Sequence, residues 1–173
     1  TPANPLCSDG TGTVTLSATG GTGTITFCDT EDGSYSADNT TYGSLAAGTH
    51  TFYAKDANDC SASTTATITI PTALTLTILA VEPDCYGETG TADLSGNGGT
   101  EPYTYCDTEN GTFSADNTTY DGLTAGTHTF YVKDANNCVA SNSATIEVPE
   151  QLVLTATPAN PLCSDGTGTV TLS

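Results

Sequence analysis

Basic side chains are rare in this sequence, and methionine and tryptophan do not occur. Its 173 residues include only two Lys plus Arg, two His, no Met and no Trp, against 20 Asp plus Glu, and the formal net charge is −18. Binding to nucleic acid requires basic side chains that displace counterions from the phosphates, so this composition argues against it. The same deficit disfavours anionic membrane surfaces. No run of about 20 apolar residues occurs, and no membrane span is predicted.

Metal-binding cysteine motifs are also missing. The sequence has seven Cys but no Cys-x-x-Cys, and its two histidines, His50 and His128, lie far apart. Zinc sites need closer ligand clusters. Regularly spaced cysteines in small domains instead indicate a disulfide framework, which persists outside the cytosol. We therefore expect an extracellular or cell-surface protein.

What the sequence does contain is repetition. Residues 1–17 recur letter for letter as residues 157–173. Between them, Cys7, Cys28 and Cys60 recur as Cys85, Cys106 and Cys138. Each cysteine is displaced by the same interval of about 78 residues, and roughly 45 of those 78 positions are identical, which is the signature of a repeat architecture.

The repeat predicts the domain organisation. We expect a first repeat at residues 1–71 that lacks its first strand, a complete second repeat at 72–149, and the start of a third at 150–173. Such a sequence is typical of a window taken from a longer array. Pro71 and Pro149 follow the last predicted strand of each repeat and would stiffen short linkers.

Short alternating segments rich in Thr, Val, Ile, Tyr and Phe, bounded by Gly, Asn and Asp, predict an all-β fold. No stretch has helical periodicity. The spacing of turn signals favours β-sandwich domains, and the short Pro-containing joints between repeats favour their arrangement in a head-to-tail rod. In the second repeat we expect strands near 74–80, 90–95, 102–106, 111–114, 127–133 and 139–148, and a further strand at 152–156 that opens the third repeat.

Several segments resemble the SprB-type repeat of very large surface adhesins and filament-like proteins of gliding bacteria. They are the early cysteine (Cys7, Cys85), the Gly-Gly-x-x-Pro-Tyr segment Gly98–Tyr103, Ala125–Thr129, Lys-Asp-Ala-Asn-x-Cys and the closing Pro-x-x-Leu. The resemblance covers nearly the whole chain. It implies immunoglobulin-like modules, secretion and a mechanical or adhesive role without catalysis. The chain departs from the family at Cys28 and Cys106, where an aromatic residue is usual.

The resemblance also suggests disulfides within each repeat, Cys7 with Cys60 and Cys85 with Cys138. Each would close a loop of about 50 residues and contribute on the order of 4 kcal/mol in the chain-entropy model. The alternative joins neighbouring repeats, for instance Cys7 with Cys138. Cys28 and Cys106 are expected to be buried thiols, because no basic side chain that would activate them is near in sequence. Cys163 repeats Cys7 and is a further disulfide candidate.

Acidic loops provide candidate calcium ligands. Alternating carboxylates and amides beside a glycine are what Ca²⁺ requires of a loop, although Asx-rich hairpin turns have the same composition. No complete EF-hand pattern is present. Apart from structural Ca²⁺ no cofactor is expected, and the candidate calcium ligands are Asp29, Glu31, Asp56, Asp59, Asp107, Glu109 and Asp134.

Three acceptor-type sequons are present, at Asn39, Asn110 and Asn117. In a secreted Thr-rich chain they could carry glycan, and the alternative is an ordinary exposed turn. Asn39 and Asn117 occupy equivalent places in the two repeats.

We therefore expect a non-enzymatic, structural repeat segment of an extracellular bacterial filament or giant adhesin. Its partners would be neighbouring repeats or subunits of the same filament, and surface glycans if tip loops bind them. Two alternatives are a glycan-binding adhesin module and a subunit that donates a strand, as in pili. Near-invariant loops such as SADNTTY favour a scaffold over a receptor.

Overall fold

The computed structural model describes residues 1–159 and 166–172, and the chain is all-β. The described strands form five small antiparallel sheets. In the described part of the chain no helix is long and apolar enough to cross a membrane. The expected fold class is therefore confirmed at the level of all-β structure.

The second repeat contains two three-stranded sheets. One has the order β10-β8-β7 and the other β12-β11-β9. The strands are β7 (Thr75–Val81), β8 (Gly90–Asn97), β9 (Thr104–Cys106), β10 (Thr119–Leu123), β11 (Gly126–Lys133) and β12 (Val139–Ile146). As expected, β11 and β12 form a hairpin, which pairs residue by residue from Gly126 with Ile146 to Lys133 with Val139.

The first repeat has the same pattern, with sheets β1-β2-β4 and β3-β5-β6. Its strands are β1 (Pro2–Ala3), β2 (Gly12–Thr15), β3 (Thr26–Cys28), β4 (Thr41–Leu45), β5 (Gly48–Lys55) and β6 (Ser61–Ile68). The two-residue strand β1 pairs Pro2 with Val14, and one period later Ala80 pairs with Ala92. Strand β1 is therefore equivalent to the last two residues of β7.

The two sheets of each repeat enclose one buried cluster. Alternation along the strands directs one face of each sheet inward. In the second repeat the cluster contains Leu76, Ala92 and Leu94 from one sheet and Tyr105, Phe130 and Val132 from the other. In the first repeat it contains only Val14, Phe52 and Ile68. Among the described residues, none occupies the place of Leu76 in the first cluster.

The third segment forms a two-stranded ladder, β13 (Ala156–Ala159) with β14 (Thr169–Leu172). Its register pairs Pro158 with Val170, as Pro2 pairs with Val14 in the first repeat. The identical sequence therefore forms the same ladder twice. Strand β13 begins at Ala156, which pairs with Leu172, so only the last residue of the strand expected at 152–156 lies in a strand.

Two other strand predictions for the second repeat need correction. Residues 111–114 form no strand; Ser114 makes only an isolated bridge to Tyr105. Strand β10 was missed, because its Asp121-Gly122 pair looks like a turn. In the structure those residues form an irregularity in the pairing with β8, between Tyr120 and Leu123.

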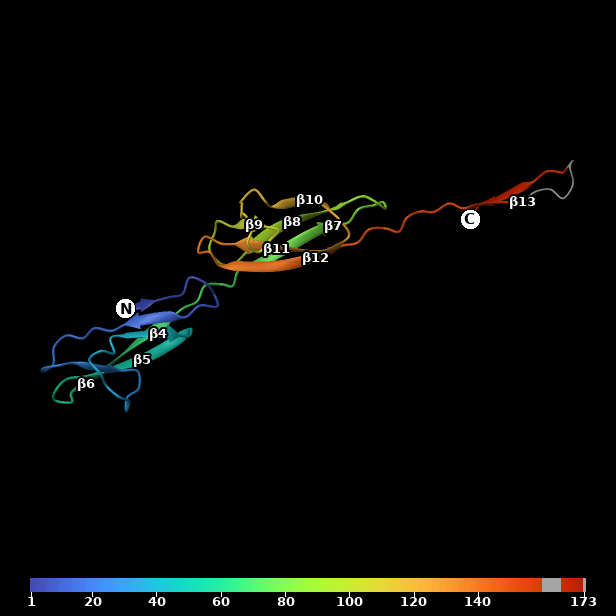
Figure 1. The fold of residues 1–173 in the computed structure, drawn as a ribbon. Coiled ribbons are helices and arrows are strands. Elements are labelled where there is room, and N and C mark those ends of the chain that lie inside the picture. Colours follow the sequence, from blue (N-terminus) through green and yellow to red (C-terminus); the bar gives the residue numbers. More distant parts are fainter. Residues whose placement is uncertain (160–165, 173) are drawn as a thin grey trace.

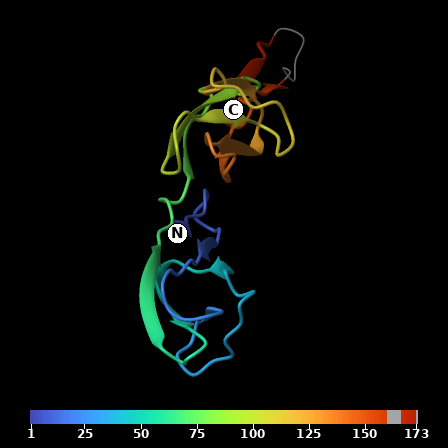
Figure 2. The ribbon, with the colours of Figure 1, turned by 90° about the vertical axis from the view of Figure 1, so that its left-hand side faces the viewer.

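The two repeats follow one another along an elongated molecule (Figure 1). A connector, residues 69–74, leads from β6 to β7 and is longer than the short linker expected from the sequence. Seen at right angles, the first repeat again lies beyond the connector from the second (Figure 2). The ends of the two repeats that meet there form the junction described next.

Candidate functional site: the junction between the repeats

A disulfide between Cys7 and Cys138 joins the two repeats, and the Cα atoms of the two residues are 5.6 Å apart. Cys7 lies in the loop between β1 and β2, where its carbonyl accepts the amide of Gly10 at 3.1 Å. Cys138 ends the loop of the β11–β12 hairpin. Sequence positions far apart therefore meet at a covalent tie between the repeats.

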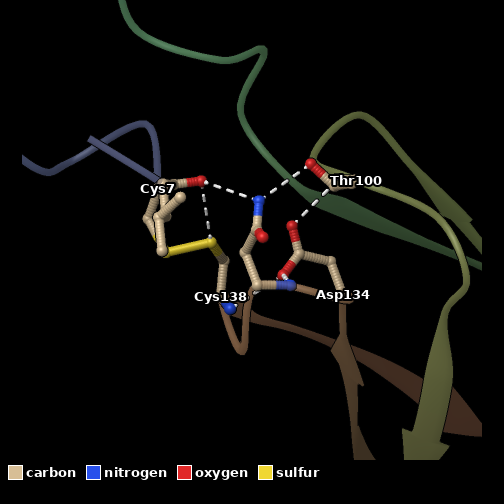
Figure 3. Close-up of a disulfide and its surroundings, with 6 residues drawn as sticks. Cys7, Thr100, Asp134 and Cys138 are labelled. Carbon is tan, nitrogen blue, oxygen red and sulfur yellow. Dashed lines mark hydrogen bonds between the residues drawn. A yellow bond between two sulfur atoms is a disulfide. The ribbon is translucent and has the colours of Figure 1, made fainter. Parts of the chain in front are cut away.

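Asp134 organises the side of the junction formed by the second repeat. It is 4% exposed and is the only buried charged residue in the described part of the chain. Its Oδ1 accepts the amides of Asn136 and Cys138, each at 2.9 Å, and its Oδ2 accepts the amide of Thr100 at 2.9 Å. One carboxylate thus holds the β11–β12 hairpin loop against the loop that contains Gly98, Gly99 and Thr100 (Figure 3).

Asn136 extends this arrangement to the first repeat. Its Nδ2 donates to Thr100 Oγ1 at 2.9 Å and to the carbonyl oxygen of Leu6 at 3.4 Å. The same carbonyl oxygen lies 3.4 Å from the sulfur of Cys138. The disulfide and the Asn136 hydrogen bond therefore grip the same loop of the first repeat.

The connector completes the junction. The carbonyl of Thr72 accepts the amide of Gly99 at 2.9 Å. A pocket of about 350 Å³ lies between the parts, lined by Leu6 and Cys7 from one side, Pro71 from the connector, and Gly99 and Cys138 from the other. A peptide connector, a disulfide and hydrogen bonds together restrain the relative orientation of the repeats.

The within-repeat pairing of Cys7 with Cys60 is wrong, and the alternative of a link between neighbouring repeats is correct for Cys7. The reason is geometric. The loop that carries Cys7 ends at Gly12, which lies against Ile68 at one end of β6, since a Cβ on Gly12 would be 2.6 Å from Ile68. Cys60 directly precedes Ser61, which is at the other end of β6. An eight-residue strand is about 23 Å long, and a disulfide requires Cα atoms within about 7 Å. The expected partner of Cys85 was Cys138, which is already bonded to Cys7.

The first repeat carries a second copy of the Asp134 arrangement. Asp56 Oδ1 accepts the amides of Asn58 and Cys60, each at 2.9 Å, and Asp56 Oδ2 accepts the amide of Thr22 at 2.9 Å. These backbone hydrogen bonds, that of Thr22 foremost, lower the pKa of the Asp56 carboxyl. The loop that ends at Cys60 therefore has the shape of the loop that ends at Cys138.

The other free cysteines differ in exposure. Cys28 and Cys106 are buried, as expected, while Cys60 and Cys85 are exposed. Cys28 Sγ lies 3.6 Å from Thr30 Oγ1, and Cys106 Sγ has the same contact with Thr108. Cys163 lies outside the described residues. Residues 1–159 and 166–172 therefore include two accessible thiols, one on each repeat.

The calcium candidates are distributed over separate loops. No group of three or more His, Cys, Asp or Glu side chains arranged for a metal ion occurs within residues 1–159 and 166–172. Asp56 and Asp134 direct their oxygens at backbone amides, which is the Asx-turn alternative. The remaining candidates, Asp29, Glu31, Asp59, Asp107 and Glu109, are exposed. Calcium binding stays a prediction.

The three sequon asparagines differ in accessibility. Asn110 is exposed, whereas Asn39 and Asn117 are half-buried. Asn39 Nδ2 donates to the carbonyl of Phe27 at 3.4 Å, and Asn117 Nδ2 donates to that of Tyr105 at 3.3 Å. Of the three, Asn110 is the most accessible acceptor for a glycan, and glycosylation stays a prediction.

The few basic side chains have local partners. Lys55 lies over the ring of Tyr35, 4.3 Å from its centroid, and Lys133 lies over Phe113 at 4.0 Å. Nε2 of each histidine lies within hydrogen-bonding distance of a carbonyl four residues earlier, 2.9 Å for His50 and 2.8 Å for His128. These contacts assign the lysines and histidines to local structure.

A second feature is an apolar groove in the first repeat. It has a volume of about 140 Å³, and its lining includes Leu16, Phe52, Ala54, Ala62 and Thr64. One period later the equivalent residues are Leu94, Phe130, Val132, Ala140 and Asn142. In the second repeat all but Asn142 pack in or against the cluster that contains Leu76, and Asn142 Nδ2 donates to the carbonyl of Leu76 at 2.9 Å. The groove is therefore the place that a strand like β7 fills in the second repeat.

The sequence pattern identified Asp56 and Asp134 only as candidate calcium ligands. It did not predict that their carboxylates accept the backbone amides of the loops that end at Cys60 and Cys138. The available signal was the repeated Asp-Ala-Asn-x-Cys segment, since Asp accepts amides two and four residues later in such turns.

No protein-family model matches this chain, and no curated protein matches it.

Proposed function

We propose that this chain is a structural repeat segment of an extracellular filament or giant surface adhesin, built from tandem immunoglobulin-like β-sandwich domains. One observation carries the proposal: the Cys7–Cys138 disulfide joins one repeat to the next. A crosslink at that place strengthens the connection between modules, which matters for a protein under tension more than for one that binds a small ligand.

Composition and repetition support the same role. Disulfides persist in oxidising compartments, which favours an extracellular location. A net charge of −18 keeps long arrays soluble and separate from one another. The residues quoted above for the SprB-type resemblance agree with a surface array.

The strand-donating subunit is a second candidate, and the apolar groove favours it. Leu152 and Leu154 are 94% and 72% exposed, and Leu154 corresponds to Leu76 by the 78-residue interval. A strand from a neighbouring subunit that carries such residues would suit the groove by β-strand addition.

Immunogold electron microscopy of the source cells, with antibodies raised against the purified chain, tests the proposal. Label on filaments or on the outer surface is the expected result, and label confined to the cytoplasm would refute it. Electrophoresis of the extracted material after reduction separates the two candidates. A sharp band near the 17.5 kDa of this chain indicates many subunits, and very large material indicates one long polypeptide.

A further inference from the structure

We infer that two copies of this chain join head to tail through a disulfide between Cys85 of one copy and Cys60 of the next. The inference rests on the proposed function and names the partner as a second copy of the chain. Cys85 is the repeat counterpart of Cys7, and Cys60 is the counterpart of Cys138. The bond would reproduce, between copies, the disulfide that already joins the two repeats.

The loop that carries Cys85 is shaped like the loop that carries Cys7. The carbonyl of Cys85 accepts the amide of Glu88 at 3.3 Å, as the carbonyl of Cys7 accepts that of Gly10 at 3.1 Å. Both loops join equivalent strands, because Ala3 pairs with Thr13 and Val81 pairs with Thr91. Cys85 is exposed and free in this structure.

The loop that carries Cys60 is likewise shaped like the loop that carries Cys138. The carboxylate of Asp56 accepts three backbone amides at 2.9 Å, and the carboxylate of Asp134 accepts the three equivalent amides of the second repeat at the same distance. The residue before each cysteine has a left-handed backbone, with φ of 61° at Asp59 and 65° at Asn137. Asn58 is the repeat counterpart of Asn136, whose Nδ2 donates to the carbonyl of Leu6 in the other repeat. Both halves of the joint are therefore preformed.

The apolar groove assigns the same direction to the joint. In the second repeat, the connector from the first repeat leads into β7, whose Leu76 fills the equivalent space. In a head-to-tail pair, the copy that supplies Cys85 also brings Leu154 to the groove of the next copy. Residues 157–159 of the copy that supplies Cys85 would then replace Thr1–Ala3 of the next copy, to which they are identical in sequence. The two features agree on which end meets which.

The bond requires a two-electron oxidant, and a small-molecule disulfide such as oxidised glutathione can supply it. The thiolate of Cys60 attacks the glutathione disulfide, which forms a mixed disulfide and releases one glutathione thiolate. The thiolate of Cys85 from the other copy then attacks the sulfur of Cys60 and releases the second. Two protein thiols are oxidised, one disulfide is reduced to two thiols, and the two protons pass to the glutathione thiolates.

The test mixes two full-length variants, each able to form only one half of the joint. Both carry Cys163→Ser, so that this cysteine cannot react; one also carries Cys60→Ser and the other Cys85→Ser. They are incubated with oxidised and reduced glutathione at about 0.15 M salt, which screens the repulsion between acidic chains. Non-reducing electrophoresis and peptide mass spectrometry then identify the crosslink. Cys60→Ala and Cys85→Ala provide second variants if a serine disturbs folding, with the Cys7–Cys138 peptide as the check.

We expect the mixture to form a dimer joined by Cys85 and Cys60, at least about tenfold more abundant than the dimer in either variant alone. The parent with both cysteines and Cys163→Ser should form a ladder of higher multimers. Absence of dimer in the mixture, or equal amounts of Cys60–Cys60 or Cys85–Cys85 homodimer in the separate variants, would overturn the inference. Immunogold labelling of filaments would be unaffected by that failure, so the two proposals can fail separately.

Discussion

Cys7 and Cys138 are 131 residues apart in sequence, and a disulfide holds their Cα atoms 5.6 Å apart. The bond connects the early loop of one repeat with the late hairpin of the next. Because these two loops lie at opposite ends of each repeat, the bond can only form between repeats. The crosslink therefore belongs to the junction of two repeats and not to a single repeat.

Removal of this disulfide should destabilise the molecule. In the chain-entropy model, a loop of this length contributes at most about 5 kcal/mol. The double variant Cys7→Ser with Cys138→Ser should unfold at a lower urea concentration by circular dichroism, with its sheets retained in buffer. The matched control, Cys60→Ser with Cys85→Ser, should unfold like the parent. Equal unfolding midpoints for the two double variants would contradict a stabilising junction.

Asp56 should make stability depend on acid pH. Folding lowers the pKa of its carboxyl, since the amides of Thr22, Cys60 and Asn58 favour the charged form. The resulting stabilisation is fully present above the unfolded pKa of about 3.9 and is lost as the pH falls through the lower folded pKa. Asp56→Asn should therefore be less stable than the parent at neutral pH, and the difference should shrink below about pH 4. Urea unfolding from pH 2 to pH 7 measures it; a difference independent of pH would count against this role.

Ser44 occupies a left-handed backbone position, with φ of 55°, where the second repeat has Gly122 with φ of 73°. A non-glycine residue there costs on the order of 1 kcal/mol. A Cβ at Gly122 would meet nothing within 4 Å, so the cost is one of backbone conformation alone. Ser44→Gly should raise the free energy of unfolding by about 0.5–1 kcal/mol, and Gly122→Ser should lower it similarly. Thermal unfolding of both variants gives the comparison, and opposite signs would refute the explanation.

Gly98 tests the contact with the connector. Gly98 and Gly20 are repeat counterparts with similar φ, 75° and 81°, but a Cβ on Gly98 would lie 2.1 Å from the carbonyl oxygen of Ala73, whereas one on Gly20 would meet nothing within 4 Å. Gly20→Ala should cost about 1 kcal/mol from the backbone alone. Gly98→Ala should cost more, because the connector must also move. Equal losses of stability in the two variants would show that the connector does not rest on this loop.

Much of the fold could be predicted from the sequence, because strand alternation and turn residues are local signals. The β11–β12 hairpin was predicted with its loop, since Asp134–Asn137 is a strong turn sequence between two alternating runs. Strand β10 was not, because its pairing irregularity at Tyr120 and Leu123 depends on the neighbouring strand β8. Of the strand expected at 152–156, only Ala156 belongs to a strand, β13, because strand formation depends on pairing and packing as well as on propensity.

The site was less predictable than the fold. The sequence supplied the candidate cysteines and the acidic loops, but composition does not distinguish a carboxylate that binds an ion from one that binds amides. The choice of Cys138 over Cys60 depended on the length of β6, which separates Cys60 from the Cys7 loop.

The duplicated seventeen residues distinguish most directly what the sequence determines from what the tertiary structure determines. By itself the sequence determined the ladder, because Val14 pairs with Pro2 and Val170 pairs with Pro158 in the same register. Yet Val14 is 1% exposed and Val170 is 62% exposed. Only the tertiary structure decided this difference: a second sheet bearing Phe52 and Ile68 packs over Val14, whereas β13 and β14 form a separate two-stranded sheet in the described part of the chain. Hydrogen bonding between strands is local, whereas burial requires an opposing sheet to remove the side chain from water.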